Sequence, residues 1–241
     1  LELKAFISQE KSGLIIVGAL NSNPEREAAK QIAIQSNWPV FVDISAGFRT
    51  ENTFPMTLFQ SAEGRAKLKG RAVLHLGGNV VSTGAQHIID EAKQCIQINY
   101  QPVGDPPGQG SKVKIQTALS TLNSLDWTGN DRFKQHCTAL HKKIHDALCH
   151  EKKDKLTETG IVFQLSRILN QKNCSFWSNS MPVRDANTIG KWPLTEHRME
   201  TNRGASGIDG IISTAAGFQM MQKKPCIVVI GDLAAWHDLN A

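Results

Sequence analysis

Short apolar runs alternate with amphipathic stretches from Gly13 to Leu125, and this alternation restricts the fold more than any other feature of the chain. The runs are rich in β-branched residues and too short for buried helices, so we expect strands at Gly13–Gly18, Pro39–Asp43, Ala72–Leu76 and Cys95–Asn99. The stretches between them carry helix signals, so we expect helices at Asn23–Ser36, Ser61–Leu68 and Thr83–Lys93, with Asn23 as the N-cap of the first. This pattern predicts a parallel sheet with helices on both faces.

The second half of the chain repeats the pattern after one long helix. Apolar residues at helical spacing predict a helix at Arg132–His150, and the charged stretch Glu151–Lys155 is expected to break it and mark a domain boundary. Beyond it we expect helices at Thr157–Asn170, after Asn179 and at Ile208–Met221, with strands at Cys174–Ser178, His197–Glu200 and Pro225–Ile230. We therefore predict two parallel-sheet α/β domains, the second truncated: residues 1–127, a connecting helix and linker at 128–155, and residues 156–241.

The strongest functional signal is a carboxylate directly after the last predicted strand. Gly231 and Asp232 follow Pro225–Ile230, and the carboxyl ends of parallel strands face the crevice where open α/β sheets bind ligands. The glycine-rich turn Asn202–Gly210 leads into the preceding predicted helix, and free backbone N–H groups there would make a cradle for an anion. Together these features predict a site for an anionic ligand.

Three segments resemble the signatures of one thiamine-diphosphate enzyme family. They are Asn-Ser-x-x-x-Arg at Asn179–Arg184, Asn-Arg-Gly-Ala-Ser-Gly-Ile-Asp-Gly at Asn202–Gly210, and Gly-Asp-Leu-x-x-x-His-Asp-x-Asn at Gly231–Asn240. This is the MenD family, which makes 2-succinyl-5-enolpyruvyl-6-hydroxy-3-cyclohexene-1-carboxylate in menaquinone and phylloquinone biosynthesis. The resemblance is strong over Phe163–Ala241 and weaker but collinear over Gly13–Leu125.

The resemblance implies a thiamine diphosphate site that is held by Mg²⁺. It implies that Asp232 is the carboxylate ligand of the metal, because Mg²⁺ prefers oxygen ligands. It places the other cofactor-binding residues at Ser206, Ile208, Gly231, Leu233 and Ala234, with Ile208 beneath the bent cofactor. It implies that Ser180, Arg184 and Arg203 bind the succinyl unit derived from 2-oxoglutarate. The planar guanidinium group of arginine matches the geometry of a carboxylate.

The implied reaction decarboxylates 2-oxoglutarate and adds the succinyl unit to isochorismate, in a parent enzyme that is a homodimer or homotetramer. By the resemblance, the pyrimidine-binding domain with its activating glutamate and a second metal ligand, an asparagine, are expected to lie outside this chain, so no catalytic residue is assigned within it. The chain is expected to be an internal piece that folds at least in its central domain but has no carboligase activity alone. Ala85 and Gln86 stand where the family commonly carries a basic residue for isochorismate.

Two other functions remain open from the sequence. One is a different thiamine-diphosphate 2-oxo-acid decarboxylase or carboligase, and the other is a non-catalytic, degenerate or scaffolding module. Nucleic-acid binding is disfavoured because the net charge of +5 is dispersed, and no apolar run approaches the roughly 20 residues of a membrane span. Five scattered cysteines without CxxC spacing favour a reduced compartment, the cytoplasm, or the plastid if the source is a photosynthetic eukaryote.

Two further patterns are not given a binding role. The helix Arg132–His150 carries His141 and His145 four residues apart, but no third zinc ligand is evident. The turn-rich stretch Gly104–Gly110 has prolines where a phosphate-binding loop needs glycines and a helix start.

Overall fold

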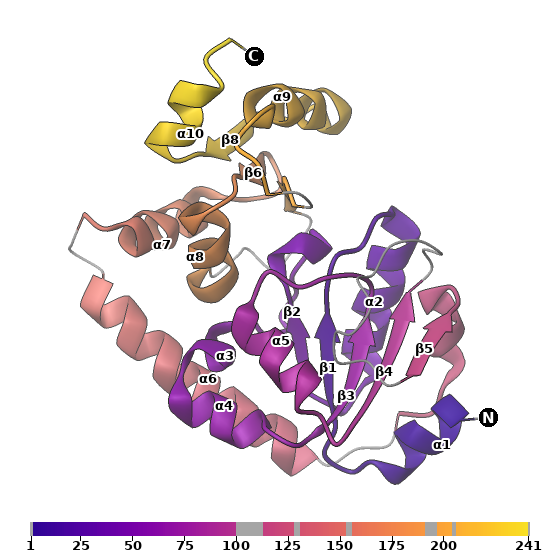
Figure 1. Ribbon diagram of the computed structural model, residues 1–241. Coiled ribbons are helices and arrows are strands. Elements are labelled where there is room, and N and C mark those ends of the chain that lie inside the picture. The colour runs from indigo at the N-terminus through magenta and orange to yellow at the C-terminus, as the bar shows by residue number, and fades with distance from the viewer. Residues whose placement is uncertain are drawn as a thin grey trace.

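The structure, a computed structural model, describes residues 2–99, 113–127, 131–152, 156–190, 197–203 and 206–240. It contains a five-stranded parallel sheet in the order β2-β1-β3-β4-β5 and a three-stranded parallel sheet in the order β7-β6-β8 (Figure 1). The predicted α/β class with two parallel sheets is confirmed.

The larger sheet and its surrounding helices come from the first part of the chain. These elements are α1 (Glu2–Gln9), β1 (Leu14–Val17), α2 (Asn23–Gln35), β2 (Val40–Val42), η1 (Ile44–Ala46), α3 (Thr57–Gln60), α4 (Ala62–Leu68), β3 (Ala72–Leu76), α5 (Thr83–Asp90), β4 (Gln94–Asn99), β5 (Val113–Gln116) and η2 (Leu119–Ser124). The second part contributes α6 (Asp131–Lys152), α7 (Glu158–Ile168), β6 (Cys174–Trp177), α8 (Met181–Ile189), β7 (Arg198–Thr201), α9 (Ile211–Gln222), β8 (Cys226–Val229) and α10 (Asp232–His237).

The larger sheet is buried on both faces, which explains why its strands read as continuous apolar runs. Every residue of β1 and β3 is buried. Ile15 and Val17 pack on one face with α1, α2 and η2, whereas Leu14 and Ile16 pack on the other with α3, α4, α5 and α6. Each fully buried Ile, Leu or Val side chain contributes about 1.5–3 kcal/mol to folding.

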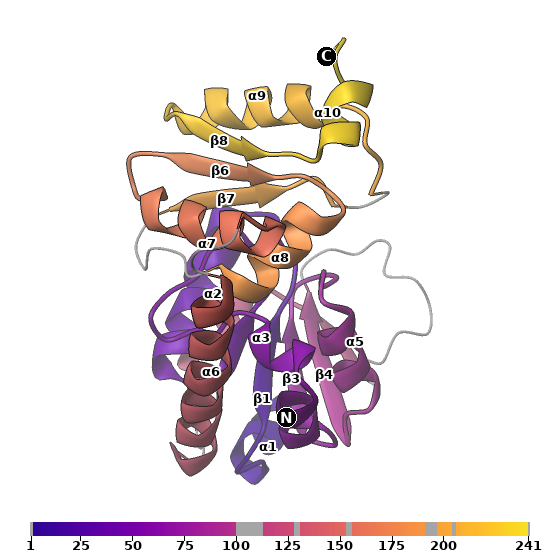
Figure 2. The same cartoon turned by 90° about the vertical axis from the view of Figure 1, so that its left-hand side faces the viewer.

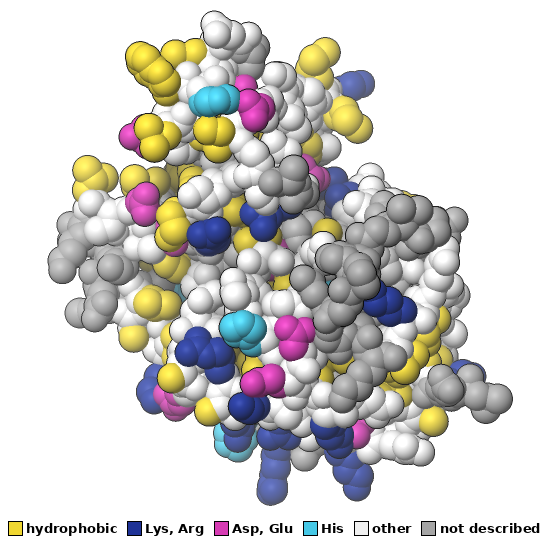
Figure 3. Space-filling model, in the orientation of Figure 1, with side chains coloured by type: hydrophobic (Ala, Val, Ile, Leu, Met, Phe, Trp, Pro, Cys, Tyr) yellow, Lys and Arg dark blue, Asp and Glu magenta, His cyan; other side chains and the backbone are white. Residues whose placement is uncertain are grey.

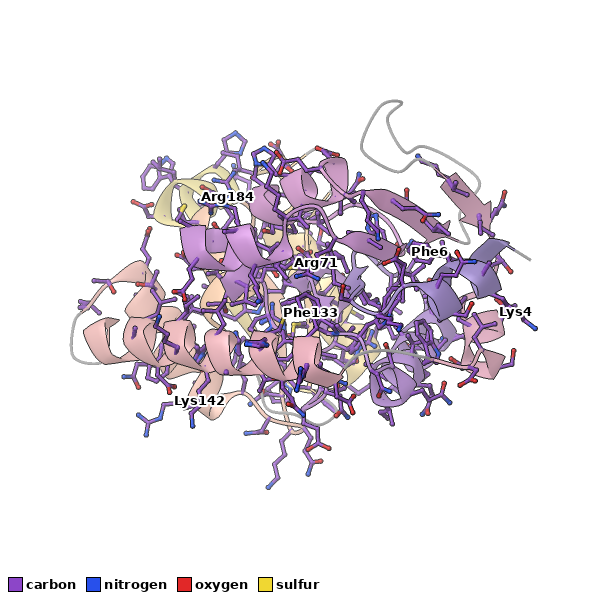
Figure 4. The ribbon with its side chains drawn as sticks, turned by 90° about the horizontal axis from the view of Figure 1, so that it is seen from below. Lys4, Phe6, Arg71, Phe133, Lys142 and Arg184 are labelled. Atoms are coloured by element: carbon purple, nitrogen blue, oxygen red, sulfur yellow. The ribbon has the colours of Figure 1, made fainter. Side chains whose placement is uncertain are left out.

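The N-terminal part of α6 packs beside the start of β3. There the guanidinium of Arg71 lies 4.4 Å from the ring centroid of Phe133, a cation–π contact between the two residues labelled in Figure 4. Lys134 also donates to the carbonyl oxygen of Ser36 at 2.9 Å. These contacts attach the long helix to the larger sheet.

The smaller sheet has its first strand in the middle. From β6 the chain passes through α8 to β7 on one side, and then through α9 to β8 on the other side. Figure 2 shows α7 and α8 on the face towards the larger sheet and α9 on the opposite face. Trp177 packs on the first face and Phe176 on the second, as the alternation of a strand requires. The order of strands reverses between β6 and β8, and such switch points are where open α/β sheets bind ligands.

The two sheets are joined by polar contacts at two places. The C-terminal end of α8 is held by the segment Asp43–Thr57, which follows β2. At the second place Arg26 forms an ion pair with Glu200 at 3.5 Å, and Arg198 donates to the side chain of Asn23 at 3.0 Å. The N-terminus of α2 and the strand β7 are therefore in contact.

Several predicted boundaries were wrong by a few residues. Ser22, not Asn23, is the N-cap of α2, because its hydroxyl and the Glu25 carboxylate form a reciprocal capping box. The helix α6 continues through Glu151 and Lys152, where we expected a break, and α9 begins at Ile211 instead of Ile208. The stretch Gly104–Gly110 and residues 153–155 lie outside the described residues, so the domain boundary stays a prediction. None of the described helices is long and apolar enough to cross a bilayer.

Two glycine-containing turns meet at the carboxyl ends of β1 and β3. Gly18, in the first of these turns, should not tolerate a side chain. A Cβ at Gly18 would overlap the carbonyl oxygen of Gly78, whereas a Cβ at Gly78 would approach Ala19 no closer than 3.7 Å. We expect Gly18→Ala to lower the free energy of unfolding by about 1–3 kcal/mol through overpacking. Gly78→Ala should change it by less than about 0.5 kcal/mol. Urea denaturation of both variants measures the difference, and equal losses would contradict the close approach.

Candidate functional site

A cavity of about 410 Å³ lies at the switch point of the smaller sheet, at the carboxyl ends of β6 and β8. Its volume is within the range of small-molecule sites. Its walls come from α7, from the turn between β6 and α8, and from the turn between β8 and α10. The lining residues are Glu158, Ile161, Val162, Asn179, Ser180, Met181, Pro182, Asp185, Ile208, Val229, Ile230, Gly231, Asp232, Leu233 and Ala234.

Most of the residues assigned by sequence line this cavity. They are Ser180, Ile208, Gly231, Asp232, Leu233 and Ala234. Asp232 is the first residue of α10 and is exposed, so its carboxylate is accessible at the cavity. Ile208 lies in the bend before α9 and is 36% exposed. The cavity thus brings together Ser180, Ile208 and Gly231, which are separated by 28 and 23 positions in the sequence.

The other three assigned residues do not line the cavity. Arg184 lies on α8 one turn beyond Ser180 and is exposed, and its position is labelled in Figure 4. Arg203 is also exposed, just after β7. Ser206 is exposed, with a positive φ of 58°, and it follows Gly204 and Ala205, which lie outside the described residues. The substrate role of both arginines therefore stays a prediction.

The turn between β6 and α8 is conformationally strained. Ser180 has φ 71° and ψ −133°, a backbone conformation that is close to the region used almost only by glycine. Holding a serine there costs about 1–3 kcal/mol, and such strain persists only where the surroundings fix it. Strain of this kind is concentrated at functional sites, and here it occurs at an assigned residue that faces a cavity.

Asn179 is a site residue that the sequence analysis quoted within a motif but did not assign. It is only 5% exposed, lines the cavity, and donates from Nδ2 to the carbonyl oxygen of Gly207 at 2.6 Å. Its side chain therefore joins the first signature segment to the second. Its Oδ1 has no hydrogen-bond partner among the described residues, so it is available to a ligand.

The expected anion cradle at the start of α9 was wrong. The N–H groups of Gly210 and Ile212 are not free, because the carboxylate of Asp238 accepts from them at 2.8 and 2.6 Å. These bonds lower the pKa of Asp238, and they supply the cap that lets α9 begin at Ile211. Asp238 belongs to the third signature segment. Through these two hydrogen bonds it holds the second signature segment and the start of α9 in place.

Asp185 is a second site residue that the sequence analysis did not assign. It lies on the buried side of α8, is 7% exposed, and its Oδ2 has no hydrogen-bond partner among the described residues. Burial, with a smaller effect from the carboxylate of Glu158, raises the pKa of Asp185 to about 6. A buried acid with a raised pKa in a cleft is a frequent mark of a functional site.

The described lining of the cavity is acidic. It contains the carboxyl groups of Glu158, Asp185 and Asp232, and neither lysine nor arginine. No group of three or more His, Cys, Asp or Glu side chains among the described residues is arranged to hold a metal ion. The role of Asp232 as a metal ligand therefore stays a prediction. Such a site would need further oxygen ligands that are not Asp or Glu side chains.

The remaining sequence candidates are placed elsewhere. His141 lies edge-on to Phe54 with ring centroids 5.6 Å apart, and burial lowers its pKa to about 4. Ala85 is fully buried in the core, so a basic side chain would not fit there. Gln86 donates to the carboxylate of Asp90 along α5 at 2.9 Å.

The chain is similar over nearly its whole length to curated proteins of one name. It is 33% identical over 255 residues to the 2-succinyl-5-enolpyruvyl-6-hydroxy-3-cyclohexene-1-carboxylate synthase of Pelodictyon phaeoclathratiforme and 30% identical over 256 residues to that of Chlorobium chlorochromatii. Both alignments cover 99% of this chain but only 42% and 43% of the relatives, so the chain spans about two fifths of their length. It is also 26% identical to the chloroplastic protein PHYLLO of Arabidopsis thaliana, covering 16% of that protein. No protein-family model matches the chain.

The raised pKa of Asp185 predicts a pH-dependent cost to stability. The acid has a pKa of about 3.9 in an unfolded chain and of about 6 in the folded protein. The folded state therefore loses stability as pH rises through this window, with no penalty below it and the full penalty above pH 6. We expect Asp185→Asn to raise the free energy of unfolding by roughly 1–3 kcal/mol at pH 8, since one pKa unit corresponds to about 1.4 kcal/mol.

The gain should shrink steadily as pH falls towards 4.5, which chemical denaturation at several pH values measures. The exposed Asp126→Asn is the control and should show no such gain. A gain in the free energy of unfolding of Asp185→Asn that is independent of pH would mean that ionisation of the Asp185 carboxyl is not the source of the gain.

Proposed function

Because the chain belongs to the family of the 2-succinyl-5-enolpyruvyl-6-hydroxy-3-cyclohexene-1-carboxylate synthases, we propose that it forms the central domain and part of the cofactor domain of a thiamine-diphosphate-dependent transferase. The proposed substrates are 2-oxoglutarate and isochorismate. The single observation that carries the proposal is the cavity at the switch point, where the turn with Asp232, the turn with Ser180 and the bend with Ile208 meet.

The residues present fit a Mg²⁺–diphosphate group. A diphosphate is strongly anionic, and the described lining offers carboxylates but no lysine or arginine, so a bound cation would be needed to balance their negative charges. Mg²⁺ is usually held by one or two carboxylates together with phosphate oxygens. Asp232, exposed at the carboxyl end of β8, would provide the carboxylate. The backbone of Gly231–Ala234 would lie beside the diphosphate, and Ile208 would give an apolar contact to the cofactor.

The bound cofactor would supply the electron sink for loss of CO₂ and for formation of the new carbon–carbon bond. This chain contributes position and exclusion of water. Ile161, Val162, Ile208 and Val229 give the cavity an apolar wall, in which hydrogen bonds and charges act more strongly than in water. Asn179 and Asp185 would accept hydrogen bonds from the bound molecules through oxygen atoms that have no partner in the described protein.

Carboxylate recognition is proposed for the polar groups near the cavity. Ser180 is the N-cap of α8 and Arg184 is the fourth residue of that helix, so both lie near its start. Arg203 follows the neighbouring strand β7. The exposed guanidinium groups of Arg184 and Arg203 can bind the carboxylates of a 2-oxo diacid bidentately.

The smaller sheet also supports an oligomeric parent protein. Large apolar side chains are exposed around α9 and α10, and they appear in yellow at the top of Figure 3. Met220, Met221, Leu233 and Trp236 are each 77–81% exposed. Clusters of this kind mark contact with further polypeptide. We include a homodimer or homotetramer in the proposal, located in the cytoplasm, or in a plastid as the chloroplastic relative favours.

The first test concerns the metal ligand. In the full-length protein Asp232→Asn should weaken Mg²⁺-dependent binding of thiamine diphosphate, because it removes the only negatively charged protein group that is proposed to bind the metal. Calorimetry during titration of Mg²⁺ at a fixed cofactor concentration should show that the variant needs at least a ten-fold higher Mg²⁺ concentration to bind the cofactor. The control is Asp126→Asn, an exposed acid near the larger sheet. An unchanged requirement in Asp232→Asn would reject the assignment.

The second test separates the two substrates. Arg184→Ala and Arg203→Ala should raise the KM for 2-oxoglutarate by ten- to hundred-fold, since losing a hydrogen bond to a charged group costs about 1.5–3 kcal/mol. The KM for isochorismate should change much less. Arg167→Ala, which removes an exposed arginine from α7, is the matched control. Equal effects on both substrates would mean that the arginines support the fold or the cofactor instead.

A further inference from the structure

The C-terminal end of α8 is held by a buried cation from the other sheet. Arg49 is 8% exposed, and its Nη1 donates to the carbonyl oxygen of Gly190 at 2.9 Å and to that of Ala186 at 3.5 Å. Its Nη2 donates to the carbonyl oxygen and the Oδ1 of Asn187 at 2.8 and 3.0 Å. The last carbonyl groups of a helix lack partners within the helix and carry a partial negative charge, so they suit a guanidinium.

Further hydrogen bonds from the segment Asp43–Thr57 hold the same end of α8. Met56 donates its N–H to the carbonyl oxygen of Asn187 at 3.1 Å, and Ile44 donates its N–H to the Asn187 side chain at 2.9 Å. Thr57 donates from Oγ1 to the carbonyl oxygen of Thr188 at 2.5 Å. Four carbonyl groups and the Asn187 side chain at this end of α8 are therefore bonded to the segment Asp43–Thr57.

This contact tolerates little displacement of the helix. Burial lowers the pKa of Arg49 to about 9, although the nearby Asp43 opposes the shift. A buried charge is stable only while its hydrogen bonds are made, and a shift of α8 by about one ångström would break several of them together. The arrangement thus favours one position of the helix over its neighbours.

The other end of the same helix forms the cavity. α8 has nine residues and is about 13 Å long at 1.5 Å per residue, so its two ends are separated by only about 2.5 turns of helix. Its first residues follow Ser180, whose strained backbone must be held by its surroundings, and Asp185 faces the cavity from the same helix. Fixing one end of α8 therefore fixes the other.

We propose that Arg49 is a positioning residue for the cavity: by holding the C-terminal carbonyls of α8, it sets where Ser180, Arg184 and Asp185 stand relative to the cofactor and substrate. Arg49 itself does not line that cavity. The inference rests on the proposed function for its ligands, but the restraint on α8 can be measured without any ligand.

The experiment compares three variants of the full-length protein. Arg49→Met removes the cation, Arg49→Lys keeps the charge but loses the planar fork, and Ile32→Val is a core change in α2 that reduces stability away from α8. Hydrogen exchange of the α8 amides is measured first. We expect at least ten-fold faster exchange in Met181–Ile189 for Arg49→Met, a smaller increase for Arg49→Lys, and no change in α9.

Steady-state kinetics are measured next, well below the unfolding midpoints of all variants. We expect kcat/KM for 2-oxoglutarate to fall at least ten-fold in Arg49→Met, with partial recovery in Arg49→Lys and no change in Ile32→Val. Faster α8 exchange with unchanged kcat/KM would reduce Arg49 to a stabilising residue and overturn the proposal, as would unchanged exchange. Failure of the unmodified protein to use 2-oxoglutarate would reject the proposed function. The hydrogen-exchange result would then still decide whether Arg49 restrains α8.

Discussion

The buried carboxylate of Asp43 is the interaction on which the joining of the two sheets depends. It is fully buried at the end of β2, and its Oδ1 accepts from the N–H and hydroxyl of Ser45 at 3.0 and 2.7 Å. Its Oδ2 accepts from the N–H groups of Val81 and Ser82 and from the side chain of Asn187 at 2.9, 3.3 and 2.8 Å. One carboxylate thereby holds the turn after β2, the turn before α5 and the end of α8. A buried charge needs this many donors to be stable, so each of the three segments is held by the others.

The walls of the cavity come from several segments between Glu158 and Ala234. The three signature segments meet through side chains that act as links. Asn179 bonds to Gly207, and Asp238 bonds to Gly210 and Ile212. These polar residues in the motifs therefore hold the site together, while Ser180 and Asp232 face the space that it encloses. Asp238 also explains why α9 starts later than expected, since the side chain that caps this helix lies 26 to 28 residues further along the sequence.

The electrostatics of the cavity favour a cation together with an anionic ligand. Carboxyl groups of Glu158, Asp185 and Asp232 line it, and the described lining has no basic residue. The pKa of Asp185 is raised first by burial and second by the neighbouring carboxylate of Glu158. A divalent cation held by Asp232 would offset this negative charge, so the proposed Mg²⁺ and diphosphate would suit the site better than a free anion would.

The sequence by itself determined the α/β class, most strands of both sheets and the location of a carboxylate at the end of β8. Apolar runs such as Leu14–Val17 and Ala72–Leu76 identify buried parallel strands, because burial on both faces leaves no polar alternation. The signature segments also contain most of the residues that line the cavity. The sequence did not identify Asn179 and Asp185 as site residues, nor Asp238 as the cap of α9. Only the tertiary structure decided these, because burial, loss of hydrogen-bond partners and capping across 26 to 28 residues arise only when distant segments are packed together.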